Sequence, residues 1–484
     1  MNSPMARRAF LRLTTSSLFA AAGGLSFGQS SAADETRGIV RVTHSNARLR
    51  IPPSTPAGQI WRYCISFPFQ LAPRKAAAIF NIRGNHPGDY EVGTDFIPFD
   101  SLSPFQAGKA LPLSRIAKAT NPNSQPPGEP CWLIKQWPRV GFIPLGAKRS
   151  DGSAHPHAGT GFGINDVSAW PLIDKHAAPG ADSRPSDPFG GREHYGYHEV
   201  HQFAYDGTKF RILESESIAP DRLLSGWVLG SGGMTSAVPD GDDLVIPFTG
   251  RRKNGVGGIG LLRWRRQRGK WRPERFVPAL MGNDGQGSFE PSLVRDLDGA
   301  WLLSARGSGD NAKSIRVWRA DDDGAHWSRL LSLPGVLPIS PVALHRATDG
   351  ALFIAANLTS SDIPANIADQ FPLPRDAAGH PLKGRIRETL CLWPLDVQNA
   401  RLQPPLVIRD GRADFGPPPG GITWSIDHPI AANLQLSDGL WHTVLGYRVV
   451  DRAETNRGFA PPPETGAYLE EVHSAGKPIP AWQF

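Results

Sequence analysis

Cysteine, methionine and tyrosine are scarce in this 484-residue chain, with three, four and seven copies against 14 tryptophans. Cys64, Cys131 and Cys391 are far apart and form no Cys-x-x-Cys pair, which excludes the usual zinc-ribbon and dithiol redox motifs. We expect these thiols to be buried and unpaired. No segment reaches about 18 consecutive apolar residues, so the sequence predicts a mature protein without a membrane span. No run of five or more Lys or Arg occurs, which argues against nucleic acid as a partner.

The formal net charge of +7 includes +3 from the first 33 residues, which leaves a mild +4 for the remainder. This balance is compatible with an anionic substrate. The first 33 residues read Ala6-Arg7-Arg8-Ala9-Phe10-Leu11-Arg12, then an apolar run from 13 to 25, then small residues up to Ala33. The arrangement resembles a bacterial twin-arginine signal peptide. The resemblance implies cleavage near Ala32 or Ala33, the twin-arginine translocase as an export partner, and a periplasmic or secreted location.

Glycine (52) and proline (46) are abundant, which favours many short strands joined by turns over a helical bundle. Three stretches share one pattern: 290–306, 340–357 and 428–448. Each reads x-Pro, a short apolar run, Asp-Gly, and a second apolar run that ends in a polar residue. Asp-Gly between two such runs is a strong hairpin signal. A looser fourth copy, 234–251, turns at Asp240-Gly241.

A second hairpin follows each copy and carries Trp264, Trp318 or Trp393, at spacings of 54 and 75 residues with an insertion around 358–385. Units of four antiparallel strands at such intervals predict an all-β fold, a β-propeller of six or seven blades, with six favoured. The alternative is a β-sandwich, which does not require the x-Pro pattern to recur. We expect a propeller domain over 34–457 and a Pro-rich tail over 458–484 that runs along the surface.

One turn carries a family resemblance. The segment 320–327, Ala-Asp-Asp-Asp-Gly-Ala-His-Trp, resembles the Asp-box (BNR repeat) of the sialidase superfamily, with Ala320 in place of serine. In this motif Asp322 would bond turn amides, Gly324 would take a positive φ, and Trp327 would pack between strands. The resemblance implies a sialidase-like propeller.

The same resemblance extends to candidate site residues. Glu290 and Arg306 match the spacing of the sialidase glutamate that assists the nucleophile and of one of three arginines that clamp the substrate carboxylate. Arg387, with Arg385 close behind, resembles the third clamp arginine. Arg50, in Arg50-Ile51-Pro52, resembles the first. Arginine suits this role because its planar fork binds carboxylates in a bidentate way.

The sequence departs from the sialidase pattern at the nucleophile. His428, in Asp427-His428-Pro429, occupies the place of the sialidase tyrosine, and Tyr447 follows about 19 residues later. Glycoside cleavage needs a proton donor and an activated nucleophile or water, and a carboxylate with a histidine can divide that work. We therefore expect Glu290 and His428 to be catalytic, with Asp427 orienting the imidazole, and Tyr447 to contact substrate.

Histidines gather in the N-terminal half, at His155, His157, His194, His198 and His201. In a strand, His155 and His157 would share a face, and two such residues with a third ligand can bind zinc. The alternative is a hydrogen-bonding rim of the substrate pocket. The rim is favoured, so the sequence predicts no metal and no cofactor.

The sequence thus predicts an exported, exo-acting glycoside hydrolase that acts on an acidic, carboxylated sugar without the usual tyrosine nucleophile. Two alternatives stay open at this point. A uronate lyase would use His428 or a tyrosine to remove the proton next to the carboxylate. A catalytically silent propeller would bind glycans without turning them over.

Overall fold

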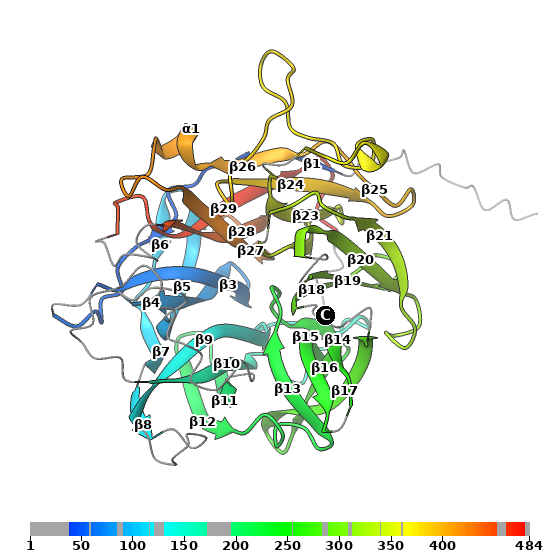
Figure 1. The fold of residues 1–484 in the computed structure, drawn as a ribbon. Coiled ribbons are helices and arrows are strands. Elements are labelled where there is room, and N and C mark those ends of the chain that lie inside the picture. The colour runs from blue at the N-terminus through cyan, green and yellow to red at the C-terminus, as the bar shows by residue number, and fades with distance from the viewer. Residues whose placement is uncertain are drawn as a thin grey trace, which may run out of the picture. The chain divides into compact units, whose positions relative to one another are not determined.

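A computed structural model describes residues 38–57, 60–84, 91–115, 117–120, 130–171, 195–253, 255–282, 289–307, 312–338, 340–359, 362–452 and 461–479. Six antiparallel sheets stand in a ring, each forming one blade of a propeller (Figure 1). The predicted all-β propeller with six blades is confirmed. The signal-peptide prediction, residues 1–33, lies outside the described residues.

The first three blades follow each other along the chain. Blade 1 contains β3 (Arg62–Ala72), β4 (Lys75–Arg83), β5 (Glu91–Leu102), β6 (Phe105–Ala107) and β7 (Leu111–Arg115). Blade 2 contains β8 (Ala117–Thr120), β9 (Pro130–Ile143), β10 (Thr160–Pro171), β11 (Tyr195–Tyr205) and β12 (Phe210–Ile218). Blade 3 contains β13 (Trp227–Gly232), β14 (Val238–Asp240), β15 (Asp243–Arg252), β16 (Gly257–Gln267) and β17 (Lys270–Met281).

The other three blades hold the predicted repeats. Blade 4 contains β18 (Phe289–Arg295), β19 (Trp301–Arg306), β20 (Ile315–Ala320) and β21 (Ser328–Leu333). Blade 5 contains β22 (Ala343–Arg346), β23 (Leu352–Asn357), β24 (Thr389–Asp396), β25 (Arg401–Leu402) and β26 (Leu406–Asp410), with the short helices η2 (Ala365–Ile367) and α1 (Gly411–Phe415). Blade 6 contains β27 (Trp424–Gln435), β28 (Trp441–Asp451), β29 (Gly466–Ser474), β1 (Ile39–Thr43) and β2 (Arg48–Leu49).

Each blade begins with a strand that faces its neighbours around the ring. Strand β3 contacts β9 and β27, and β22 contacts β18 and β27. In the repeats, the innermost strand leads to the Asp-Gly turn, whose glycine takes a positive φ (Gly299 +90°, Gly350 +89°). The innermost strands therefore run in the same direction: each begins on one face of the ring and ends at its turn on the other. We call the face on which these strands begin the leading face.

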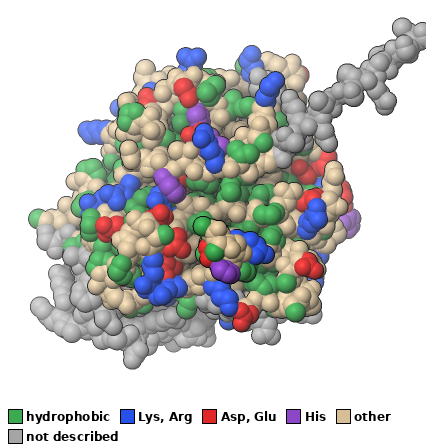
Figure 2. Space-filling model, turned by 90° about the horizontal axis from the view of Figure 1, so that it is seen from above, with side chains coloured by type: hydrophobic (Ala, Val, Ile, Leu, Met, Phe, Trp, Pro, Cys, Tyr) green, Lys and Arg blue, Asp and Glu red, His purple; other side chains and the backbone are tan. Residues whose placement is uncertain are grey.

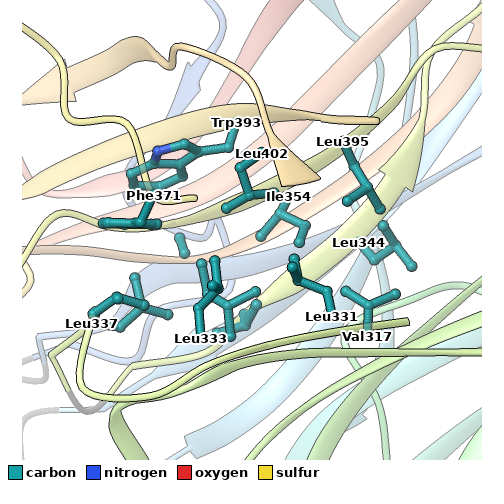
Figure 3. Packing of buried hydrophobic residues seen from close by; sticks show 14 of the residues in the cluster. Val317, Leu331, Leu333, Leu337, Leu344, Ile354, Phe371, Trp393, Leu395 and Leu402 are labelled. Atoms are coloured by element: carbon teal, nitrogen blue, oxygen red, sulfur yellow. The ribbon is translucent and has the colours of Figure 1, made fainter. Parts of the chain in front are cut away.

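Sheet-to-sheet packing fills the space between blades with aliphatic and aromatic side chains. Figure 3 shows the cluster between blades 4 and 5, where Leu333 and Leu337 face Ile354. The insertion at 358–385 contributes Phe371, whose ring stacks on Trp393 with centroids 5.1 Å apart. Part of the insertion is thus core rather than a surface loop.

The C-terminal segment differs from its prediction. The sequence predicts a surface tail over 458–484, whereas Gly466–Ser474 forms β29, which lies between β28 and β1 and is largely buried. The first and last strands of the ring therefore share one sheet. Backbone pairing across this sheet closes the propeller, which is why an apparently unremarkable tail is part of the core.

Both ends of the described domain meet one turn of blade 5. The Asp349 Oδ2 atom accepts hydrogen bonds from the Gly38 amide at 3.1 Å and the Gly476 amide at 3.2 Å. Asp349 is 1% exposed. This turn lies on the face opposite the leading face.

The turn at 320–327, the cysteines and the expected lack of a membrane span can be compared directly with the structure. At 320–327, the Asp322 carboxylate accepts from the His326 amide at 2.9 Å, and Gly324 has φ +84°. Cys64 and Cys391 are buried thiols. No helix within the described ranges is long and apolar enough to cross a membrane.

Candidate functional site

Three non-glycine residues on the leading face have left-handed backbone conformations: Glu290 (φ +52°), Arg387 (φ +60°) and His428 (φ +57°). Such conformations cost energy for residues with a Cβ and concentrate at functional sites. The other non-glycine residues with positive φ lie in hairpin turns, where that conformation is expected: Arg74, Arg268, Asp323 and Ala400.

The x-Pro pairs explain two of these conformations. The strand register shifts between Phe289 and Ser292 in β18, and between Asp427 and Ile430 in β27. Proline has no N–H to give to the ladder, so Glu290-Pro291 and His428-Pro429 sit in bulges. A bulge breaks the alternation of side chains between the two faces of a strand. Both candidate catalytic residues, Glu290 and His428, lie at such a break.

Glu290 and Arg306, the two site residues predicted in blade 4, lie in contact. The Arg306 Nε atom lies 3.1 Å from the Glu290 Oε2 atom. Arg306 ends β19 opposite Phe289, the residue before Glu290. The glutamate side chain is 4% exposed and the arginine side chain 13%. The pair is thus a nearly buried ion pair at the leading face of blade 4.

Asp427 is the centre of a second cluster, at the leading face of blades 5 and 6. Its carboxylate accepts from Arg448 Nε at 2.5 Å, Arg387 Nη1 at 2.8 Å and Ser425 Oγ at 2.9 Å. The His428 Nδ1 atom lies 2.8 Å from Asp427 Oδ1. Arg448 is the cross-strand partner of Asp427 on β28. Three of the site residues predicted from the sequence therefore form one cluster: Asp427, His428 and Arg387.

The electrostatics of this cluster fix its protonation. Burial opposes the charge on Asp427, but Arg448, His428 and Arg387 overcome this effect and hold the pKa of Asp427 well below its usual value. Burial, followed by the positive charge of Arg448, lowers the pKa of His428 to about 4. At neutral pH the imidazole is therefore neutral. Because ionised Asp427 only accepts hydrogen bonds, Nδ1 carries the proton and the lone pair is on Nε2.

The charge balance of the two clusters is positive. Arg306, Arg387 and Arg448 stand against two carboxylates. Arg62, Arg83 and Glu91, all buried, lie near Cys64, where Arg62, Arg83 and Arg448 oppose the burial that raises its pKa and Glu91 adds to it. Figure 2 views the ring from its rim, where acidic and basic side chains are interspersed. The positive charge of the two clusters would favour an anion.

Arg448 and Ser425 were not among the site residues predicted from the sequence. A signal for Arg448 existed, since it is the polar residue that ends the third repeat, as Arg306 ends the first. Ser425 had no such signal, because its role depends on the side chain of Asp427 two residues later. Arg385, the alternative to Arg387, is 60% exposed and lies 3.6 Å from Glu388.

Tyr447 is not brought to the cluster. It is fully buried, and its hydroxyl donates to Glu470 Oε1 at 2.8 Å and accepts from Arg409 Nε at 3.0 Å. Its ring stacks on Tyr468. Burial and the nearby Glu470 raise the pKa of Tyr447 well above its usual value. Adjacent strand residues point to opposite faces of a sheet, so Arg448 faces the site and Tyr447 faces the neighbouring layer.

His155 and His157 lie away from the leading face. They occupy the turn after β9, where the His155 Nε2 atom is 3.3 Å from the Gly241 carbonyl oxygen and His157 packs edge-on against Trp271. Gly241 belongs to an Asp-Gly turn, at the opposite end of the strands from Glu290. These histidines are therefore not gathered with the two clusters.

The remaining histidines of this region have separate partners. His198 Nδ1 lies 3.1 Å from Asp166, and His201 Nδ1 lies 2.7 Å from Ser215 Oγ. His194 lies outside the described residues. Across the described part of the chain, no three or more His, Cys, Asp or Glu side chains are arranged to hold a metal ion.

Arg50 also lies outside the Asp427 cluster. It follows β2, and its carbonyl oxygen accepts from the Tyr63 amide at 2.8 Å. Its side chain lines a cavity beside Trp61 and Arg62. This cavity opens at the leading face, because it lies where β3 and β29 begin.

No protein-family model and no curated protein matches the chain. Solved structures with a similar backbone arrangement include a Dyadobacter fermentans protein of unknown function, at 12% identity over 90% of this chain and 99% of that chain (TM-score 0.46). The NanB sialidase from Streptococcus pneumoniae is 10% identical over 90% of this chain and 70% of that chain (TM-score 0.47). The α-L-arabinofuranosidase of Fusarium graminearum is 10% identical over 89% and 98% (TM-score 0.45).

Proposed function

We propose that the protein is a glycoside hydrolase that acts on a carboxylated sugar, with His428 as the base. The observation that carries the proposal is the Asp427–His428 pair: a buried, ionised carboxylate holds a neutral imidazole with its lone pair on Nε2. An oriented neutral imidazole is a general base. The strained backbone of His428 supports a functional role.

The proposed reaction uses both clusters. His428 Nε2 takes a proton from water, and the water oxygen bonds to the anomeric carbon as the bond to the leaving oxygen breaks. Glu290, which is ionised beside Arg306 in the free protein, takes up a proton as the substrate carboxylate binds that arginine, gives this proton to the leaving oxygen and becomes a carboxylate again. The imidazolium then releases its proton to solvent, which restores His428. Asp427 stabilises the transient imidazolium.

The excess of guanidinium groups supports an acidic substrate. Arg387 and Arg306 have side chains 19% and 13% exposed, so both are partly accessible to solvent. A guanidinium binds a carboxylate by two parallel hydrogen bonds. An uncharged sugar would leave the net positive charge of the clusters uncompensated.

β-Elimination is the second candidate, because a neutral base among guanidinium groups also suits proton abstraction next to a carboxylate. In that reaction His428 would remove the proton, and the arginines would neutralise the carboxylate as the adjacent C–O bond breaks. The product would contain a carbon–carbon double bond conjugated to the carboxylate. This double bond absorbs ultraviolet light, which distinguishes the two reactions.

The test is product analysis on a panel of sialosides, uronides and acidic polysaccharides. New reducing ends without ultraviolet absorbance support hydrolysis, and new absorbance establishes elimination instead. Glu290→Gln and His428→Asn should each lower kcat by about 10²–10⁴-fold, the usual contribution of a general acid or base. Asn suits the left-handed backbone at 428. If no substrate is turned over but acidic glycans bind, the protein is a glycan-binding propeller and the hydrolase proposal fails.

We also propose export by the twin-arginine route, for which the sequence of residues 6–33 is the support. Replacing Arg7 and Arg8 by lysine should leave the protein in the cytoplasm with its leader uncleaved. Periplasmic accumulation of the double variant, measured by cell fractionation, would contradict this proposal.

A further inference from the structure

The cavity beside Arg50 has the composition of a carbohydrate subsite. It has a volume of about 270 Å³ and is lined by Arg50, Ile51, Thr55, Ile60, Trp61, Arg62, Pro461 and Thr465. Drug-sized ligands occupy pockets of about 300–1,000 Å³, so this cavity suits about one sugar unit. Its walls combine apolar and aromatic surface with two guanidinium groups and two hydroxyls, which match the apolar face, the acidic group and the hydroxyls of such a unit.

Arg50 itself indicates the charge of the ligand. It lines the cavity and is half-buried. A guanidinium in this position would pair with an anionic group that enters the cavity. Ile51, which is 61% exposed, stands at the rim as apolar surface for a ligand to cover.

The register of blade 6 places this cavity relative to Asp427. Asp427 pairs with Arg448, Arg448 with Ala467, and Ala467 with Leu49, the residue before Arg50. These four residues lie in one row across neighbouring strands. Three strand spacings of about 4.8 Å put Leu49 about 14 Å from Asp427. An oligosaccharide can span this separation.

We propose that the cavity is a second subsite, which binds another acidic unit of an oligosaccharide whose scissile bond lies at His428. This inference rests on the proposed function and extends it, because it assigns the substrate to oligosaccharides with repeated acidic units. Arg50 would then act apart from Arg306 and Arg387, which hold the unit at the reacting centre.

The test compares the full chain and its Arg50→Gln variant by calorimetric titration with acidic mono- and trisaccharides, namely galacturonic acid and trigalacturonate, and sialic acid and α2,8-linked trisialic acid. The wild type should bind at least one trisaccharide about tenfold or more tightly than its monosaccharide. Arg50→Gln should lower this ratio of trisaccharide to monosaccharide affinity about tenfold, the loss expected for one charge-assisted contact. Arg50→Lys, which keeps the charge without the fork, should give an intermediate ratio.

Two controls keep the outcome interpretable. Arg268→Gln removes an exposed arginine at the turn between β16 and β17, on the opposite face, and should leave the ratio unchanged. Thermal melting of each variant checks the fold. Equal affinity for mono- and trisaccharides, an unchanged ratio in Arg50→Gln, or no binding of any trisaccharide would each overturn the subsite. Binding of a trisaccharide with the expected ratio but without turnover would retain the subsite and reject the proposed hydrolysis.

Discussion

Arg448 donates from Nε to Oδ1 of Asp427 at 2.5 Å, across neighbouring strands of blade 6, and both side chains are nearly inaccessible to solvent. The same carboxylate contacts the imidazole of His428. Arg448 thus acts on the candidate base in two ways: it fixes the orientation of Asp427, and its charge lowers the pKa of His428.

Removal of Arg448 should therefore move the pH dependence of the reaction. With the His428 pKa at about 4, the acidic limb of the kcat/KM profile should lie near pH 4. Arg448→Met removes a positive charge, so the His428 pKa should rise and the limb should move toward pH 6.5. Arg448→Lys retains the charge and should keep the limb close to its wild-type position. A pH–rate profile of Arg448→Met with an unmoved limb would show that His428 is not the titrating base.

Tyr447→Phe should lower stability without lowering kcat, because Tyr447 and Arg448 lie on opposite faces of β28. The variant loses the hydroxyl between Arg409 and Glu470, and we expect a loss of about 1–3 kcal/mol in the free energy of unfolding. Because the hydroxyl lies in the buried network, kcat should stay within about twofold of the wild type. Urea denaturation and initial rates measure both quantities. A large fall in kcat with an unchanged unfolding free energy would show that Tyr447 takes part in the reaction.

Asp349 should stabilise the closed ring through the chain ends. Asp349→Ala removes the acceptor of the Gly38 and Gly476 amides as well as that of the Ala351 amide in its own turn. Asp438→Ala is the matched control: Asp438 accepts from Leu440 in the equivalent turn of blade 6. We expect Asp349→Ala to cost about 2–4 kcal/mol more than the control. Equal costs in urea denaturation would show that the contacts with the ends contribute nothing.

His345 should make the domain sensitive to acid. It is 3% exposed on β22, and its Nε2 atom accepts from the Ala431 amide of β27 at 3.2 Å. Burial lowers its pKa to about 3. A histidine with a lowered pKa stabilises the fold above its usual pKa of about 6.5 and loses that contribution as the pH falls toward 3, by up to about 5 kcal/mol in total.

The check on His345 is His345→Gln, which keeps an acceptor but does not titrate. The unfolding free energy of the wild type minus that of the variant should decrease steadily from pH 7 to pH 4.5. The difference isolates His345 from carboxylates that titrate in both proteins. A constant difference over this range would mean that His345 is not the acid-sensitive group.

Much of the architecture was predictable because its signals are local. Asp-Gly turns and x-Pro pairs act within a few residues, so the repeats at 290–306, 340–357 and 428–448 gave the strand pairs of blades 4 to 6. The pairing of Glu290 with Arg306 followed for the same reason, since both belong to one hairpin. β29 could not be recognised this way, because its partners β28 and β1 come from opposite ends of the chain.

The sequence by itself determined the all-β class, the hairpins and the residue types at the ends of their strands. Only the tertiary structure decided which of these residues meet. Asp427 draws its partners from β27, β28 and the segment before β24. By contrast, His155 lies at the opposite face, and Tyr447 is buried in a separate network. The physical reason is that charge pairing and burial depend on distances across the ring, and these are set by sheet packing and ring closure rather than by spacing along the chain.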